Sequence, residues 1–128
     1  MGNFKEDIAR TEAFVFDVDG VMTDGGIIVT PEGEFIRKFH AKDGYALSYA
    51  MKRGYHVAII TGGRGRSLTV RFEMLGVEHV YTNCFHKIDA LHELMQKLDV
   101  QAEEILYMGD DIPDIEPMLH VGMPVCPA

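Results

Sequence analysis

Short apolar runs alternate with segments of helical periodicity along most of this chain. Four of the runs are too short for helices and are predicted to form strands: Ala13–Phe16, His56–Ile60, Val80–Tyr81 and Ile105–Met108. Continuous apolar runs of this length are typical of parallel strands, because helices cover such a sheet on both faces. A last strand is expected at Pro124–Cys126. The alternation predicts an α/β fold, namely a Rossmann-like open parallel sheet with helices on both faces.

Three longer segments between these strands have apolar residues at helical spacing. They are Lys42–Arg53, Arg64–Leu75 and Lys87–Leu98, of which the last has a strong amphipathic pattern. A glycine follows each of the first two, at the position where glycine commonly ends a helix. A shorter helix is expected from Pro113 to about His120, since proline is favoured in the first turn.

A β-hairpin is expected after the first strand. Two β-prone runs, Ile27–Thr30 and Glu34–Phe39, flank the turn signal Pro31-Glu32-Gly33. No linker or shift in composition divides the chain, so residues 1–128 are expected to form one domain without a cap domain. The chain stops soon after the last expected strand, which is consistent with a missing C-terminal tail.

The composition argues against several classes of protein. The formal net charge of −8 disfavours a nucleic acid or an anionic membrane as partner, because both select basic surfaces. No apolar run approaches the roughly 20 residues that span a bilayer. Met1–Arg10 lacks the apolar stretch of a secretion signal, and Cys84 and Cys126 lie far apart without metal-ligand spacing. We expect a cytoplasmic protein with ordinary thiols.

Residues that can carry chemistry follow the expected strands or begin a helix. The four elements are Asp17-Val18-Asp19-Gly20, Thr61-Gly62-Gly63, Lys87, and Gly109-Asp110-Asp111 with Asp114. In an open parallel sheet, ligands bind beyond the carboxyl ends of the strands. Each element alone is explained as well by a turn, a helix cap or a solvated charge. Their occurrence together, in this order, predicts one shared site.

Carboxylates gathered at one edge of a sheet require a cation. Without one they would repel one another and take up protons. Oxygen ligands and the absence of soft ligands favour Mg²⁺. The carboxylates from which we predict this ion are those of Asp17, Asp19, Asp110, Asp111 and Asp114.

The same residues suit phosphoryl transfer through a covalent intermediate. Asp17 would attack phosphorus, and Asp19 would protonate the leaving oxygen and then activate water. The Thr61 hydroxyl and the N–H groups around Gly62 would hold phosphate oxygens at a helix start. Lys87 would supply the compensating positive charge.

The ordered motifs resemble those of haloacid dehalogenase-like phosphatases. The resemblance is carried by DVDGVMTDG at 17–25, IITG at 59–62, Lys87 and YMGDDIPD at 107–114, and it covers nearly the whole chain. It implies that Asp17 is the nucleophile, that Asp19 is the acid and base, and that Thr61 and Lys87 hold the phosphate. The implied magnesium ligands are the Asp17 carboxylate, the Asp19 backbone carbonyl and Asp110, with Asp111 and Asp114 in support.

The opening motif, the hairpin and the missing cap insertion resemble, more narrowly, the capless sugar-acid phosphatases of this family. That resemblance implies release of phosphate from a 2-keto-3-deoxy sugar acid, 3-deoxy-D-manno-octulosonate 8-phosphate, during lipopolysaccharide precursor synthesis. It also implies a homotetramer in which hairpins pack together and a neighbouring subunit covers the active site.

Two departures from the family pattern concern the substrate. Gly62-Gly63-Arg64 has one glycine more than usual before its arginine, so Arg64 is a candidate for binding substrate or an ordinary solvated side chain. The resemblance also implies a glycine- and arginine-containing tail after the last strand, whereas this sequence ends at Ala128. Three alternatives stay open: another small phosphate monoester such as a nine-carbon sugar acid 9-phosphate, a receiver-like phospho-acceptor module, and a non-catalytic assembly module.

Overall fold

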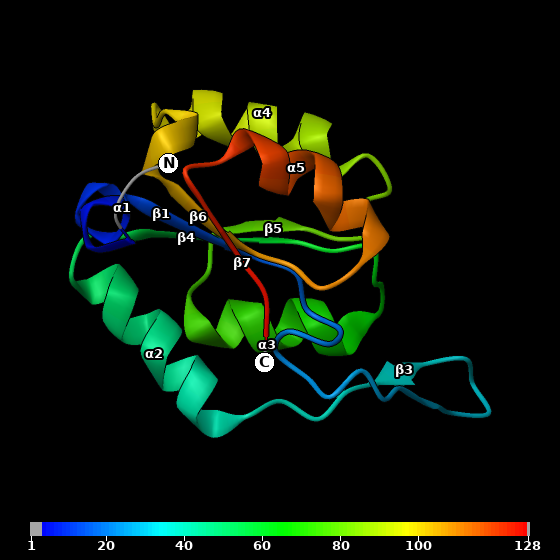
Figure 1. The fold of residues 1–128 in the computed structure, drawn as a ribbon. Coiled ribbons are helices and arrows are strands. Elements are labelled where there is room, and N and C mark those ends of the chain that lie inside the picture. The colour runs from blue at the N-terminus through cyan, green and yellow to red at the C-terminus, as the bar shows by residue number, and fades with distance from the viewer. Residues whose placement is uncertain (1–3, 128) are drawn as a thin grey trace.

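A five-stranded parallel sheet forms the centre of the computed structural model, which describes residues 4–127 (Figure 1). Its strands are β1 (Ala13–Phe16), β4 (His56–Ile60), β5 (His79–Tyr81), β6 (Ile105–Met108) and β7 (Met123–Val125). Their order is β5-β4-β1-β6-β7, and every adjacent pair is parallel. Phe16 at the end of β1 lies level with Ile59 and Met108, so the three central strands end within one residue of one another. The predicted open parallel sheet is confirmed.

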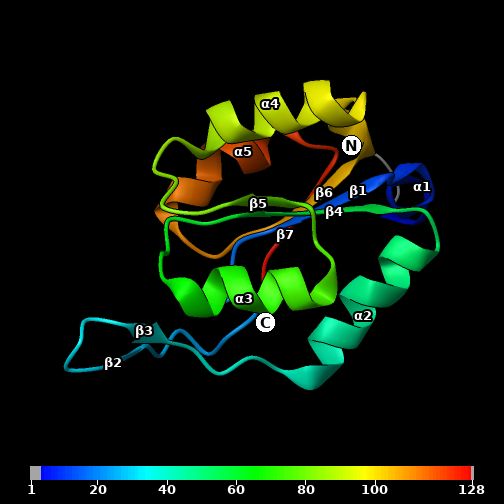
Figure 2. The same ribbon diagram turned by 180° about the vertical axis from the view of Figure 1, so that it is seen from behind.

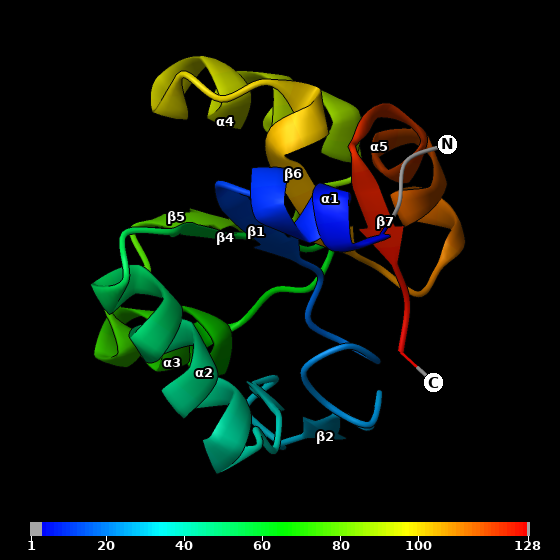
Figure 3. The same ribbon diagram turned by 60° about the vertical axis from the view of Figure 1, so that its left-hand side comes forward.

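Helices cover both faces of the sheet. α2 (Ala41–Lys52) and α3 (Arg66–Leu75) lie on one face, and α4 (Lys87–Leu98) and α5 (Ile115–His120) lie on the other (Figure 3). The alternating direction of side chains along a strand divides the apolar residues between two cores. Val57 and Ile59 of β4 pack in the core under α2 and α3, whereas Ala58 and Ile60 pack in the core under α4. The continuous apolar run of β4 is therefore buried on both faces.

The predicted hairpin is present as β2 (Ile28–Val29) and β3 (Phe35–Ile36), which pair antiparallel. It extends past the start of α3 on the side of the sheet where the strands end (Figure 2). The paired region is shorter than the two predicted runs: Ile28 pairs with Ile36, and Val29 pairs with Phe35. Ile28 and Val29 are 67% and 61% exposed, so the hairpin presents apolar side chains to its surroundings.

Two short helical elements were not predicted. α1 (Phe4–Arg10) has seven residues, too few to show a clear helical period. The 3₁₀ turn η1 (Ala102–Glu104) begins with a reciprocal capping box between Gln101 and Glu104. Within residues 4–127, no helix combines the length and the apolar character that crossing a membrane requires.

α2 begins one residue before its predicted start, at Ala41, and two other predicted helices start two residues late. α3 begins at Arg66 rather than at Arg64, because Gly65 has φ 118°, outside the helical region. The segment around Pro113 divides into a 3₁₀ turn, η2 (Ile112–Asp114), and α5. Asp114 is the last residue of η2, and its buried side chain contacts Tyr107 of β6.

Candidate active site

The strand ends bring the predicted residues to one edge of the sheet. Asp17 directly follows β1, Thr61 directly follows β4, and Asp110 lies two residues after β6. The Asp17 N–H donates to the Met108 carbonyl at 3.0 Å, which extends the pairing of β1 with β6 up to the site. Lys87, the first residue of α4, reaches the same place, and its Nζ lies 3.4 Å from Asp17 Oδ2. The structure thus brings together residues that are up to 93 positions apart in the sequence.

Three carboxylates at this edge lie close enough to share one cation. Oxygen atoms of Asp17, Asp110 and Asp114 all lie within 4.8 Å of one another. Gly20 makes this possible, since a Cβ at that position would overlap Asp110 Oδ2, and its φ of 85° also favours glycine. Asp110 therefore lies against the backbone that follows Asp19, from which a carbonyl ligand is predicted.

Asp114 is fully buried and uses both carboxylate oxygens to organise the site. Its Oδ1 accepts hydrogen bonds from Lys87 Nζ at 2.7 Å and from the Tyr107 hydroxyl at 2.9 Å. Its Oδ2 accepts from the backbone N–H groups of Asp110 and Asp111, at 3.2 and 3.4 Å. No role was predicted for Tyr107, although a tyrosine inside a buried strand usually has a polar partner for its hydroxyl. Asp114 thus fixes the lysine and the acidic loop at once.

The electrostatics of this cluster fit a divalent cation. Burial raises the pKa of Asp17 to about 6, while Lys87 opposes that change and Asp114 adds to it. The pKa of Asp110 is raised as well, chiefly by desolvation and then by the neighbouring carboxylates. Among residues 4–127, the three clustered carboxylates pair with one ammonium, that of Lys87, so their charges sum to −2 when all four groups are ionised. An oxygen-only ligand set with this charge suits a hard ion such as Mg²⁺.

A hollow of about 250 Å³ opens over these groups. Its lining consists of Asp17, Asp19, Thr61, Gly62, Gly63, Cys84, Phe85, Lys87, Asp110, Asp111 and Pro113. The Thr61 hydroxyl accepts from the Gly63 N–H at 3.0 Å and favours the ionised form of Asp17. Cys84 was not predicted in the site, and burial raises the pKa of its thiol. One lysine, a hydroxyl and backbone amides beside clustered acids are a set that can bind a phosphate together with a metal.

A buried arginine that sequence analysis did not single out contacts Asp19. Arg37 Nε donates to Asp19 Oδ1 at 2.7 Å, Nη2 donates to Oδ2 at 3.3 Å, and Nη1 donates to the Arg64 carbonyl at 2.9 Å. Its side chain is 1% exposed, whereas that of Asp19 is 27% exposed. Arg37 directly follows β3, so the hairpin brings it to the site. The only sequence signal is its place two residues after Phe35, on the same face of the strand.

The additional glycine in the Gly62-Gly63-Arg64 motif has a physical reason. A Cβ at position 63 would lie 2.8 Å from Arg37 Nη2 and 3.0 Å from Asp19 Oδ2. The Arg64 guanidinium lies over the Phe35 ring, 5.4 Å from its centroid. Arg64 lines a second hollow of about 490 Å³ that shares a wall with the first, formed by Asp19, Gly62, Gly63 and Phe85. The structure therefore places Arg64 beside the first hollow rather than inside it.

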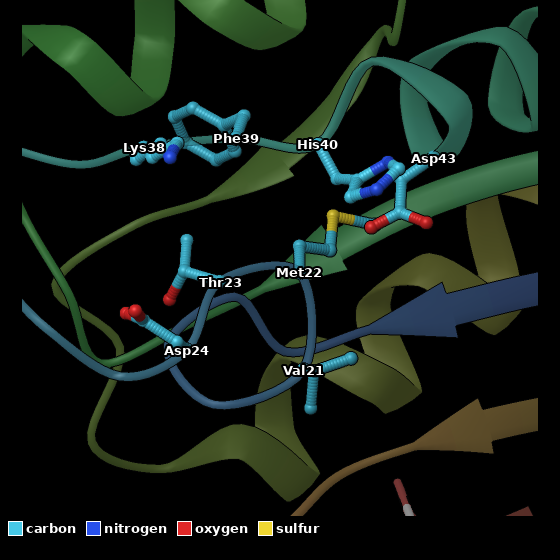
Figure 4. A pocket seen from close by; sticks show the side chains of 8 residues that line it. All are labelled: Val21, Met22, Thr23, Asp24, Lys38, Phe39, His40 and Asp43. Carbon is cyan, nitrogen blue, oxygen red and sulfur yellow. The ribbon is translucent and has the colours of Figure 1, made fainter.

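Another hollow, of about 330 Å³, lies between the loop after β1 and the segment that leads into α2 (Figure 4). Its lining consists of Val21, Met22, Thr23, Asp24, Lys38, Phe39, His40 and Asp43. Neither the acidic cluster nor Thr61 or Lys87 contributes to it. We therefore place the candidate active site at the first hollow.

Comparison with known proteins identifies the family. One family model, that of the haloacid dehalogenase-like hydrolases, matches residues 43–122, which is more than half of the chain. The chain belongs to the haloacid dehalogenase-like hydrolase family. The match includes the predicted helix that begins at Lys87 and the acidic loop at Asp110, so the predicted family is confirmed.

Relatives of this haloacid dehalogenase-like hydrolase share a more specific name. The 3-deoxy-D-manno-octulosonate 8-phosphate phosphatase KdsC of Yersinia pestis is 39% identical over 120 residues, which cover 94% of this chain and 64% of the relative. KdsC of Escherichia coli K12 is 37% identical over 124 residues, which cover 94% of this chain and 66% of that relative. The chain thus spans slightly less than two thirds of the length of these relatives.

Solved structures of haloacid dehalogenase-like hydrolases have the same fold. The crystal structure of the Yersinia pestis phosphatase superposes with a TM-score of 0.92 at 38% identity, covering 94% of this chain and 65% of that one. The phosphatase of Moraxella catarrhalis superposes with a TM-score of 0.90 at 31% identity, covering 94% and 70%. That structure is a complex with a magnesium ion, a phosphate ion and a KDO molecule.

Proposed function

We propose that this hydrolase is a magnesium-dependent phosphatase that acts on a phosphorylated 2-keto-3-deoxy sugar acid, 3-deoxy-D-manno-octulosonate 8-phosphate. The observation that carries the proposal is the meeting of Asp17, Asp110 and Lys87 around one hollow at the carboxyl edge of the sheet. The relatives named for this activity, one of them solved with magnesium, phosphate and KDO, support the choice of metal and substrate.

Asp17 is the proposed nucleophile. Its Oδ1 accepts the N–H of Val18 at 2.7 Å, which fixes the orientation of the carboxylate. A carboxylate oxygen attacks phosphorus, the bond to the leaving oxygen breaks, and an aspartyl-phosphate forms. Lys87 and Thr61 hold the nonbridging oxygens, so the charge of the transferring group is balanced by groups already in place.

Asp19 is the proposed acid and base. It gives a proton to the leaving oxygen, then takes a proton from the water that attacks the aspartyl-phosphate, which releases phosphate and restores Asp17. Mg²⁺, held by the Asp17 carboxylate, the Asp19 carbonyl and Asp110 with support from Asp111 and Asp114, neutralises phosphate charge that the acidic site would otherwise repel.

The second hollow suits the sugar acid that leaves. It adjoins the phosphate hollow at Asp19, where the proposed acid meets the ester oxygen. Ile27 and Phe35 provide apolar walls, and Arg64 and Asn83 provide donors. We propose that Arg64 pairs with the substrate carboxylate, which a guanidinium binds well.

Other functions fit these observations less well. A phosphatase for a nine-carbon sugar acid 9-phosphate, or for another small phosphate monoester, would use the same chemistry with a different occupant of the second hollow. A receiver-like module or a non-catalytic assembly module is not favoured. Neither needs an acid beside the nucleophile, whereas Asp19 lines the same hollow as Asp17 in a chain of a hydrolase family.

A substrate panel with magnesium tests the proposal. Phosphate release from 3-deoxy-D-manno-octulosonate 8-phosphate should exceed release from a nine-carbon sugar acid 9-phosphate and from hexose phosphates by at least about tenfold in kcat/KM, a difference of about 1.4 kcal/mol. Chelation by EDTA should stop all turnover, and added Mg²⁺ should restore it. If no phosphate ester is hydrolysed in the presence of Mg²⁺, the proposed function is wrong.

We also propose a homotetramer in which hairpins pack together and a neighbour covers the site. The exposed apolar side chains of Ile28 and Val29, and of Phe85 at the rim of the phosphate hollow, favour this assembly. Sedimentation should give the mass of four chains, and Ile28→Glu should shift it toward smaller species and lower kcat/KM. A fully active monomer would contradict the proposal.

Lipopolysaccharide precursor synthesis in the cytoplasm is the proposed setting. The substrate named for the relatives and the free thiols of Cys84 and Cys126, which suit a reducing compartment, support it.

A further inference from the structure

We propose that Arg37 is a positioning residue that acts through Asp19, and that Gly63 is small in order to admit its guanidinium. The inference rests on the proposed phosphatase function and adds a role for the hairpin within one chain. The hairpin strand β3 ends directly before Arg37, so it places the Arg37 guanidinium beside Asp19, the proposed acid and base.

The contacts of Arg37 fix the plane of the Asp19 carboxylate. Nε and Nη2 each donate to a different oxygen of Asp19, at 2.7 and 3.3 Å, which is a bidentate arrangement. Nη1 donates to the Arg64 carbonyl at 2.9 Å, so the guanidinium is itself held at its other side. Without Arg37, this carboxylate, which is 27% exposed, would lose both of these hydrogen bonds and the restriction that they place on its two side-chain torsions. Arg37 therefore limits Asp19 to one orientation.

The orientation that Arg37 imposes is directed toward the phosphate site. The position of a Cβ at Gly63 lies 2.8 Å from Arg37 Nη2, 3.0 Å from Asp19 Oδ2 and 3.2 Å from Thr61 Oγ1. These three atoms thus surround the same small space, and two of them belong to residues that line the phosphate hollow. Oδ2, the more weakly held oxygen of Asp19, is the one that borders this space. In the proposed reaction, that oxygen exchanges a proton with the ester oxygen and with water.

A purely structural role for Arg37 explains these contacts less well. The hairpin is already attached to α3 by Ser67, whose hydroxyl donates to the Phe35 carbonyl at 2.7 Å. Phe35 also lies under the Arg64 guanidinium. An apolar residue at position 37 would fill a buried space without the cost of desolvating a charge. Arg37 is instead charged, its side chain is 1% exposed, and its guanidinium forms an ion pair with the Asp19 carboxylate. We infer that its function is to hold this carboxylate.

A double-mutant cycle on kcat tests whether Arg37 acts through Asp19. Arg37→Met is expected to lower kcat by about 10- to 100-fold, the size of effect that a misplaced catalytic group produces, with KM within about twofold. In an Asp19→Asn background, itself severely slowed, the same change is expected to lower kcat by less than about twofold, because the group that Arg37 positions is absent. Arg53→Met, at the exposed end of α2, is the control and should match the wild type.

Two further variants keep the test decisive if Arg37→Met folds poorly. Arg37→Lys should recover part of the lost kcat, since a lysine provides a cation but no bidentate fork. Gly63→Ala should lower kcat as Arg37→Met does, and the two losses should not add. Melting temperatures measured alongside show that each variant is folded.

The outcomes separate this inference from the proposed function. If the wild type hydrolyses the phosphate ester and the losses from Arg37→Met and Asp19→Asn multiply, Arg37 acts independently of Asp19 and the inference is wrong. A raised KM with unchanged kcat would also overturn it, because Arg37 would then bind the leaving group. If the wild type hydrolyses no phosphate ester, both the proposed function and this inference are wrong.

Discussion

Replacing Asp17 by Asn is expected to abolish magnesium-dependent hydrolysis of both the sugar-acid phosphate and an aryl phosphate. The amide keeps the shape of the side chain but cannot form the acyl-phosphate, so the loss in kcat should be on the order of 10⁴-fold or more, as for other covalent nucleophiles. Glu93→Gln is the control, because it makes the same chemical change on a carboxylate that is 56% exposed on α4. Turnover by Asp17→Asn within tenfold of the wild type would remove Asp17 as nucleophile.

The same substitution should stabilise the protein when no metal is present. Burial raises the pKa of Asp17 from 3.8 to about 6, so the folded state binds a proton more tightly than the unfolded state does. The associated stability is complete below pH 3.8 and is lost as the pH rises through about 6. At pH 8 the ionised carboxylate therefore costs up to about 3 kcal/mol, the equivalent of two pKa units, and Asn avoids this cost.

Thermal unfolding with EDTA should show this gain. The midpoint of Asp17→Asn should exceed that of the wild type at pH 8, and the gap should narrow toward pH 5. Added Mg²⁺ should raise the midpoint of the wild type more than that of the variant, since the ion loses a charged ligand. A variant that is less stable than the wild type at pH 8 in EDTA would contradict the assigned desolvation.

Local patterns in the sequence were sufficient for the sheet and for most helices. The run Ala13–Phe16 and the amphipathic segment Lys87–Leu98 have the predicted bounds, because burial on two faces leaves a continuous apolar run and burial of one helix face leaves a helical period. The start of α3 was missed, since the backbone of Gly65 depends on contacts that are distant in sequence. α1 was missed because a helix of seven residues has little period of its own.

The site could be predicted to the extent that it follows strand ends. Asp17, Thr61 and Asp110 come after adjacent strands, so the parallel topology alone predicts that they meet. Arg37 could not be found in this way, because the hairpin belongs to a separate sheet and its position over the edge depends on long-range packing. Tyr107 was predicted only as part of a strand and a motif, since the fold alone reveals that its hydroxyl donates to Asp114. The catalytic and ligand roles of these residues stay predictions.

Asp114→Asn is expected to be among the most destabilising isosteric changes in the chain. The Asp114 carboxylate accepts four hydrogen bonds: from the Lys87 ammonium and the Tyr107 hydroxyl on Oδ1, and from two backbone N–H groups on Oδ2. A carboxylate only accepts, whereas an amide must turn its NH₂ toward one of these sets. Breaking a buried pair in this way typically costs about 3–5 kcal/mol. Activity should fall about 100-fold or more, because both Lys87 and the acidic loop lose their anchor.

Removing the lysine as well should return stability without returning activity. In Lys87→Met/Asp114→Asn, the amide NH₂ can donate to the Tyr107 hydroxyl, which also accepts, while the amide oxygen keeps the two backbone N–H groups. In Asp114→Asn the buried ammonium loses its 2.7 Å carboxylate contact and keeps the longer one to Asp17 Oδ2, at 3.4 Å. The double variant removes this poorly compensated charge, so urea unfolding in EDTA should show it to be more stable than Asp114→Asn alone by about 1–3 kcal/mol. Phosphate release should stay lost, since the group proposed to hold phosphate is gone. If the two destabilisations simply add, Lys87 and Asp114 are not energetically linked, and the anchoring role assigned to Asp114 is wrong.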